Sequence, residues 1–380
     1  MSCKNCTVRN CAECQRGRAP ILDAYDACEG GEGREGEYGV AVDIGTTTVV
    51  CELINIKTAE RVSVFSCMNS QREYGRDVLA RISRAIDRSA AHMHKLILGD
   101  IRRGLAEFAG HEITRITICG NTTMLHLLQN LPCDGLGVYP FTPVSVASAQ
   151  VDFFGCPATI LPGVSAFIGA DIVAGLYNIT GDLSPFWGSG TASPRTFLLI
   201  DLGTNGEMVL FDGERFLATS VAAGPAFESG SVFLASDVIS QCAELVRKGV
   251  VDETGRLCGE AAISQADIRE VQLAKAAVRA GIQMLLDEAG CGLHCVDKVF
   301  LAGGFGYTMD AGDALTLGLL PAGLPVSKIQ AVGNAALGGT AKFLLRPDIS
   351  EIQKIAASVT EINLATHPQF EQLFLEHLNF

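Results

Sequence analysis

Two short turns in this sequence carry residue types that could bind phosphate groups. Residues 42–50 read VDIGTTTVV and residues 200–209 read IDLGTNGEMV, so each places an aspartate, a glycine and at least one threonine between apolar β-forming stretches. Backbone amides of such a turn point into a small concavity, where threonine hydroxyls add donors for phosphate oxygens. An aspartate at its mouth can hold Mg2+ through water. One turn is weak support, because Gly-Thr turns occur in many hairpins, but two predict a clamp around one nucleotide.

A third glycine-rich turn, LAGGFG at residues 301–306, follows an apolar strand-like stretch. Its glycines would let the backbone approach a flat adenosine closely. Standing alone, the same residues would be interpreted as an ordinary turn from a strand to a helix.

Four of the 14 cysteines form a group at the start of the sequence, with the spacing C-x2-C-x4-C-x2-C. Their thiolates could wrap one tetrahedral metal, and the two C-x2-C pairs suit zinc as well as a [4Fe–4S] cluster. Spacing alone favours structural zinc, so both metals stay open at this point. A second metal site in CGLHC, residues 291–295, is less expected than a helix end with buried thiols. The group consists of Cys3, Cys6, Cys11 and Cys14.

The elements that must hold these turns form a pattern that occurs twice. Residues 38–67 predict three strands in an antiparallel meander, and residues 196–218 repeat it with a hairpin turn at Asp212-Gly213. A repeated strand-turn-strand unit indicates a duplicated fold with two similar lobes. Helices are expected over Arg76–Asp87, Ala90–Phe108, Ser236–Lys248 and Ala266–Glu288.

The segments outside this pattern are rich in turn-forming residues. Leu131–Pro194 contains many Pro, Gly and Ser residues, so we expect a loop and the join between two lobes there. Gly30–Gly36 has the glycine and charge content of a flexible tether, which places a boundary near Glu37.

Composition narrows the class of protein further. The chain has 380 residues, 42 acidic and 29 basic, and its net charge of −13 argues against nucleic acid or an anionic membrane as the main partner. No basic start with an apolar core marks a signal peptide, and no run of about 18 apolar residues would span a membrane. We therefore expect a cytoplasmic protein whose cysteines serve as thiols or metal ligands and not as a disulfide framework.

Taken together, the three turns resemble the phosphate 1, phosphate 2 and adenosine motifs of the acetate/sugar kinase, Hsp70 and actin (ASKHA) superfamily. Further blocks resemble the ATP-dependent reductive activators of corrinoid proteins across nearly all of Tyr38 to about Leu345. These blocks are CGNTTMLHLL, VYPFTPV, DLGTNGEMVL, AAGPAFESG, DIREVQLAKAAVRAG and LAGGFGYTMDAGDALTLGLLP.

The resemblance implies an α/β chain with a duplicated, two-lobed, actin-like (ribonuclease H-like) ATPase fold and a small N-terminal cysteine-rich metal-binding arm. The implied divisions are the arm at 1–17, a linker at 18–37, lobe I at 38–195, lobe II at 196–345 and a C-terminal extension at 346–380 that packs on the lobes.

The resemblance also implies the residues of a Mg2+–ATP site. The carboxylates that would hold the metal or orient water are Asp43, Asp201, Glu207 and Glu228. The residues that would contact the nucleotide are Gly45, Thr46, Thr47, Thr48, Gly203, Thr204, Asn205, Gly206, Gly224, Gly303, Gly304, Phe305 and Gly306.

By the same resemblance, ATP hydrolysis would drive an electron from an iron–sulfur cluster to a Co(II) corrinoid held by a partner protein. The expected cluster is [4Fe–4S], and zinc is the alternative metal for the cysteine site. An upstream electron donor and a homodimer are expected as well. The region from Asn121 to Pro143 is the expected partner surface, because nucleotide binding does not explain its blocks. Three alternatives stay open: another low-potential metalloprotein as acceptor, a small-molecule kinase, and a non-enzymatic ATP-binding module with a zinc knuckle.

The sequence departs from this family in two places. The N-terminal [2Fe–2S] domain of many corrinoid activators and the C-terminal ferredoxin-like clusters of others are not found in these 380 residues, and the cysteine group stands in their place. The segment after GPAFESG is also shorter than the family pattern, which puts the details of the nucleotide pocket in question.

Overall fold

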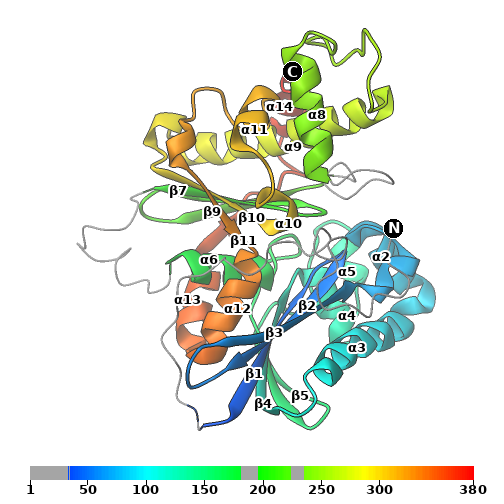
Figure 1. The fold of residues 1–380 in the computed structure, drawn as a ribbon, viewed down its shortest axis with the longest axis vertical. Helices are drawn as coiled ribbons and strands as arrows, with labels where there is room; N and C mark the ends of the chain where they lie inside the picture. Colours follow the sequence, from blue (N-terminus) through cyan, green and yellow to red (C-terminus); the bar gives the residue numbers. More distant parts are fainter. Residues whose placement is uncertain (1–32, 34, 181–195, 224–234) are drawn as a thin grey trace.

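The computed structural model describes residue 33 and residues 35–180, 196–223 and 235–380. Two mixed six-stranded sheets form the centres of two lobes, which lie one above the other in Figure 1. The predicted α/β fold with two lobes is confirmed, whereas the N-terminal arm lies outside the described residues.

The first sheet has the strand order β3-β2-β1-β4-β6-β5. Strands β1, β2 and β3 form the expected antiparallel meander, and β4 lies parallel to β1 on its other side. Strand β6 is parallel to β4, and β5 is antiparallel to β6. The strands span Glu37–Ile44 (β1), Thr48–Asn55 (β2), Arg61–Met68 (β3), Glu112–Gly120 (β4), Ala149–Phe153 (β5) and Cys156–Ile160 (β6).

The second sheet repeats this plan with the order β11-β10-β7-β8-β9-β12. Strands β7, β8 and β9 form the second meander, and β10 lies parallel to β7 as β4 does to β1. This shared topology confirms the duplication. The strands span Phe197–Leu202 (β7), Gly206–Phe211 (β8), Phe216–Val221 (β9), Lys298–Ala302 (β10), Ile329–Gly333 (β11) and Val359–Glu361 (β12).

Most of the expected helices are found within two residues of their predicted ends. The helix expected over Arg76–Asp87 is shorter at both ends. The Asp77 side chain accepts the Ala80 amide at 2.8 Å as an N-cap, the α-helix ends at Arg84, and the chain leaves the helical conformation at Asp87 and Arg88, the latter with φ +75°. The longer helices are α2 (Val78–Arg84), α3 (Ala90–Glu107), α4 (Thr122–Leu128), α6 (Ala170–Thr180), α8 (Ala235–Arg247), α9 (Gln265–Ala289), α12 (Ala335–Leu345), α13 (Ile349–Ser358) and α14 (Phe370–Glu376). Shorter turns are η2 (Ser70–Tyr74), η3 (Ala85–Ser89), α5 (Asp134–Gly137), α10 (Gly303–Gly306), α11 (Ala311–Thr316), η5 (Leu293–Cys295) and η6 (Val326–Lys328).

The prediction of loop structure between residues 131 and 194 was wrong for much of that segment. It contains β5, β6 and α6, and residues 181–195 lie outside the described part of the chain. Helix α6 was not predicted because the segment is rich in glycine and proline. In the structure, small residues of α6 and α12 permit close packing of the two helices. A Cβ on Gly339 of α12 would lie 1.8 Å from the Ala174 carbonyl oxygen, so these two helices pack backbone to backbone.

Strand β7 shows how the second sheet lies between two layers. Alternate side chains of a strand point to opposite faces. Phe197 and Leu199 join the core that contains α6 and the first sheet, whereas Leu198 and Ile200 join the core beneath α8 and α9. None of the helices in the described ranges is long and apolar enough to cross a membrane.

Candidate nucleotide site

The two predicted phosphate turns face each other across the lobes. The Thr47 and Thr204 hydroxyl oxygens lie 3.0 Å apart, although the residues are far apart in sequence. Each turn is closed by its own backbone hydrogen bond, from Gly45 N to the Thr48 carbonyl and from Gly203 N to the Asn205 carbonyl, both at 2.9 Å. The arrangement fits one ligand held from both sides.

Four carboxyl groups from four different elements gather at these turns. They are Asp43 at the end of β1, Asp171 in the first turn of α6, Asp201 in β7 and Glu207 in β8. Asp201 and Glu207 are direct partners in the β7–β8 register. Glu207 is 9% exposed, and the Asn205 side chain hydrogen-bonds to its carboxyl group.

The electrostatics of this cluster favour a bound cation. Burial, followed by the charges of Asp171 and Asp43, raises the pKa of Asp201 to about 8. Burial and then the charge of Asp43 raise the pKa of Asp171 to about 7. Burial raises the pKa of Glu207 well above its ordinary value, with Asp171 and Asp201 contributing next. Ionised carboxylates that lie close together in a buried site raise the free energy of the protein unless a cation neutralises them.

The donor set fits Mg2+ bound together with phosphates. Among the residues described here, no group of three or more His, Cys, Asp or Glu side chains could hold a metal ion by itself. Mg2+ usually keeps several waters and takes only one or two carboxylates plus substrate phosphates. Carboxylates around two hydroxyl-bearing turns therefore suit Mg2+–nucleotide better than a metal alone.

Asp43 is held by two neighbours that the sequence interpretation did not include. The Asn334 amide Nδ2 donates to Asp43 Oδ2 at 2.7 Å, and the Cys119 thiol lies 3.6 Å from Oδ1. Burial raises the pKa of Asp43, and these two hydrogen bonds oppose that rise. Asn334 caps α12, and Cys119 pairs with Asp43 in the β1–β4 register.

The first turn is anchored from three sides. The fully buried Arg81 guanidinium donates to the Thr46 carbonyl and, at 3.0 Å, to the Gly75 carbonyl. Asn121 Nδ2 donates to Thr46 Oγ1 at 3.0 Å, and Asn69 Nδ2 donates to the Gly45 carbonyl at 2.8 Å. Helix α2 and the N-cap residues of η2 and α4 thus fix the turn where β1 ends.

The third turn lies directly against the second. Gly303 has φ +85°, and a Cβ there would lie 2.4 Å from both Asp201 Oδ1 and the Leu202 carbonyl oxygen, so only glycine fits. A Cβ on Gly304 would meet nothing within 4 Å, which leaves room beside the backbone. The Phe305 side chain is 4% exposed and packs in the core of the second lobe.

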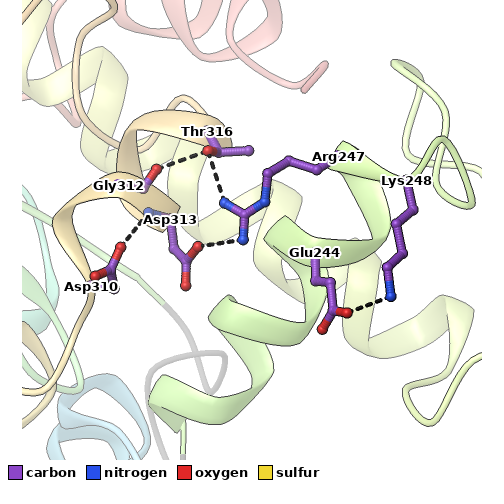
Figure 2. Close-up of polar contacts among 7 residues, drawn as sticks. All are labelled: Glu244, Arg247, Lys248, Asp310, Gly312, Asp313 and Thr316. Carbon is purple, nitrogen blue, oxygen red and sulfur yellow. Dashed lines mark hydrogen bonds and ion pairs between the residues drawn. The ribbon is translucent and has the colours of Figure 1, made fainter.

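Helix α8 is tied to the element that follows the third turn. Figure 2 shows Arg247 at the end of α8 donating to Asp313 of α11 at 2.8 Å and to Thr316 at 3.3 Å. Asp310 caps α11 by accepting the Asp313 amide at 2.9 Å. The α8–α11 contact therefore joins the segment after LAGGFG to the helix that follows residues 224–234.

Several predicted site residues cannot be placed. Gly224 and Glu228 lie outside the described residues, as do the four cysteines of the N-terminal group. Among the described residues, the sequence interpretation missed Asp171, Asn334, Cys119 and Arg81 as members of the site. The signals for Asp171 and Asn334 were an acidic residue in GAD and an asparagine in VGNAAL, and both patterns are also ordinary helix starts. Cys119 opens the block CGNTTMLHLL, which the sequence analysis assigned to a partner surface and not to this site.

The duplicated sheets, the facing turns and the gathered carboxyl groups define an ASKHA-type ATPase. Two models of the same family match the chain: the RACo middle region over residues 38–181, and the C-terminal ASKHA domain of RACo over residues 195–236 and 248–380. The chain belongs to the RACo family of corrinoid activation enzymes, which confirms the resemblance seen in the sequence.

Individual relatives agree with this assignment. The corrinoid activation enzyme RamQ of Eubacterium limosum is 27% identical, over 90% of this chain and 70% of its own length. The [Co(II) methylated amine-specific corrinoid protein] reductase of Methanosarcina barkeri is 24% identical, over 90% of this chain and 77% of its own. A solved structure titled reductive activator for corrinoid, iron–sulfur protein superposes with a TM-score of 0.81 at 26% identity, covering 92% of this chain and 67% of that one.

Proposed function

We propose that this protein is an ATP-hydrolysing enzyme that reduces a Co(II) corrinoid held by a partner protein and thereby restores Co(I) for methyl transfer. The observation that carries the proposal is the pair of facing turns with their carboxyl cluster, in a chain of the RACo family. The names of RamQ and of the corrinoid protein reductase support the choice of a corrinoid protein as acceptor.

In this proposal, residues of both lobes hold Mg2+–ATP. Thr46 to Thr48 and Gly45 bind phosphates from the first lobe, and Gly203 to Gly206 bind them from the second. Asp43 and Asp201 hold Mg2+ through water, and Gly303, Gly304 and Gly306 border the adenosine. Bound Mg2+ would neutralise charge on the phosphates and on the carboxyl cluster.

Asp171 is our candidate for orienting the attacking water, together with Glu207. A group that accepts a proton near neutral pH works best with a pKa near the working pH, and the pKa of Asp171 is raised to about 7 by burial and by Asp43. The sequence interpretation gave this role to Glu207 and Glu228. Asp171 joins them because α6 brings it beside Asp43 and Asp201.

The proposed electron carrier is an iron–sulfur cluster, [4Fe–4S] in type, held by Cys3, Cys6, Cys11 and Cys14. The described chain enters the first sheet at Glu37, whereas the phosphate turn follows the other end of β1 at Ile44. Eight residues of strand separate these points by roughly 23 Å. The phosphate turn is thus distant from the point where the linker joins the first sheet, and in our proposal ATP acts through movement of the lobes.

The test is anaerobic reduction of a purified Co(II) corrinoid protein, followed by its optical spectrum, with a low-potential chemical reductant as electron source. We expect reduction to need ATP, Asp201→Ala to abolish it with iron content unchanged, and Cys3→Ser or Cys11→Ser to abolish it with ATP hydrolysis retained. Asp171→Asn should slow hydrolysis about 100-fold or more while nucleotide still binds. Zinc in place of iron, or unchanged reduction by the cysteine variants, would remove the arm from the mechanism.

A further inference from the structure

We infer that Asn334 is the positioning residue that couples the angle between the lobes to the orientation of Asp43. The inference rests on the proposed function, because it concerns the Mg2+–nucleotide site. It adds to that function the residue that links this site to lobe movement.

Asn334 lies where the chain passes from one lobe to the other. Strand β11 belongs to the second sheet and ends at Gly333, whose φ is +64°. Helix α12 starts at Ala335 and packs against α6, β1 and β4 of the first lobe. On this connection, a rotation of the second sheet relative to the first must therefore be absorbed at or near Gly333 and Asn334, since the elements on both sides are packed.

The Asn334 side chain makes two different hydrogen bonds at this crossing. Its Oδ1 accepts the Leu337 amide at 2.8 Å and caps α12, and its Nδ2 donates to Asp43 Oδ2 at 2.7 Å. Only an amide side chain offers an acceptor and a donor together at this length. A carboxylate at this position could cap the helix but could not donate to Asp43, and serine could cap it but lacks the amide nitrogen that reaches Asp43.

Asp43 is consequently held by strand β4 of the first sheet and by the residue at which the chain crosses from the second lobe. One of its oxygens contacts Cys119, which belongs to β4 in the first sheet, and the other is bound by the crossing residue. A change of the lobe angle shifts the Asn334 amide relative to β4 and so turns the carboxylate. By reciprocity, a Mg2+–nucleotide complex that fixes Asp43 favours one lobe angle.

The test compares Asn334→Ser with wild type. Serine is as good an N-cap as asparagine, so the melting temperature of the nucleotide-free protein should fall only by the few degrees that loss of the bond to Asp43 causes. Loss of a hydrogen bond to a charged group should weaken Mg2+–ADP binding about tenfold or more in calorimetry. The same change should reduce the compaction on Mg2+–ADP binding that small-angle X-ray scattering measures.

Two controls separate coupling from capping. Asp348→Ser replaces the N-cap of α13, where Asp348 accepts the Ser350 amide at 2.9 Å, and should leave both nucleotide affinity and compaction unchanged. In an Asp43→Ala background, which removes the acceptor, Asn334→Ser should have almost no further effect on Mg2+–ADP affinity, because the two residues act through one bond.

Wild-type affinity and compaction in Asn334→Ser, or full additivity with Asp43→Ala, would overturn this inference and leave the proposed function standing. Failure of the wild-type chain to bind Mg2+–ADP at all would instead overturn the proposed function.

Discussion

The buried carboxyl cluster lowers the stability of the nucleotide-free protein as its groups ionise. The cluster consists of Asp43, Asp171, Asp201 and Glu207. Burial raises the pKa of Asp201 from an ordinary 3.8 to about 8, so the folded state binds more protons than the unfolded state between these values. Stability must therefore fall as pH rises through that window. The pKa of buried His126 and of His377 is lowered from 6.5, which acts in the opposite direction below pH 6.5. The window from pH 6.5 to 8 is free of that effect.

We predict that the free energy of unfolding of the nucleotide-free protein falls by about 1 to 2 kcal/mol between pH 6.5 and 8, because one pKa unit corresponds to about 1.4 kcal/mol. Asp201→Asn should flatten this dependence and raise stability at pH 8. Urea unfolding at several pH values measures both effects. A wild-type profile that rises over this range would contradict the prediction.

The sequence predicted some of these residues and not others, for a physical reason. Asp43 and Asp201 belong to turns whose glycine and threonines are needed together, so their pattern is local and visible. Asp171 and Asn334 reach the site only because α6 and α12 pack closely at Gly339. A single acidic residue or asparagine at the start of a helix is normally explained as a helix cap. Its role in the site becomes visible only in the tertiary structure.

Among the elements, α8 and α11 illustrate how one part of the second lobe supports the site. Arg247 is 49% exposed in its side chain, and its partner Asp313 is 11% exposed. The Lys248–Glu244 pair in Figure 2 lies within the same helix and is exposed at both ends, 62% and 57%. Both are ion pairs, but the Arg247–Asp313 pair connects α8 to α11, whereas the Lys248–Glu244 pair connects neighbouring turns at the end of α8.

We predict that Arg247→Ala lowers the free energy of unfolding by about 1 kcal/mol, because it leaves the Asp313 carboxylate without its guanidinium in a poorly hydrated place. Lys248→Ala should leave the free energy of unfolding almost unchanged, because its pair with Glu244 is exposed to solvent. Thermal unfolding of both variants makes the comparison. Equal effects would show that the α8–α11 contact adds nothing beyond an exposed ion pair.

Helices and strands could be predicted where the apolar residues followed a single helical or strand period. Helices α8 and α9 and both meanders have clear apolar patterns, and they appear at the expected residues. Strands β5 and β6 are short, and Gly155 joins them with φ +85°, so turn-forming residues outweighed the strand pattern. Their place at the edge of the first sheet could not be read from sequence spacing.

For the whole molecule, the described structure is held together across the site by the Thr47 and Thr204 hydroxyls, 3.0 Å apart. Both hydroxyls lie on the turns that would take phosphates. A nucleotide entering between the turns must therefore replace this direct contact between lobes with contacts through its phosphate groups, and the lobes must part before they close again.

This exchange leads to a prediction for Thr204→Val, which keeps the branched shape of the side chain and removes the hydroxyl. Without nucleotide, the variant should have a larger radius of gyration than wild type in small-angle X-ray scattering, because the contact between lobes is lost. With Mg2+–ADP, it should compact as wild type does but bind about five- to tenfold more weakly, as expected for one lost hydrogen bond. Thr58→Val, in an exposed turn of the first lobe, should match wild type in both measurements. If Thr204→Val instead has wild-type dimensions without nucleotide, then packing between the lobes, such as that of Phe197 and Leu199 in the core of the first lobe, and not the hydroxyl pair, sets the resting angle.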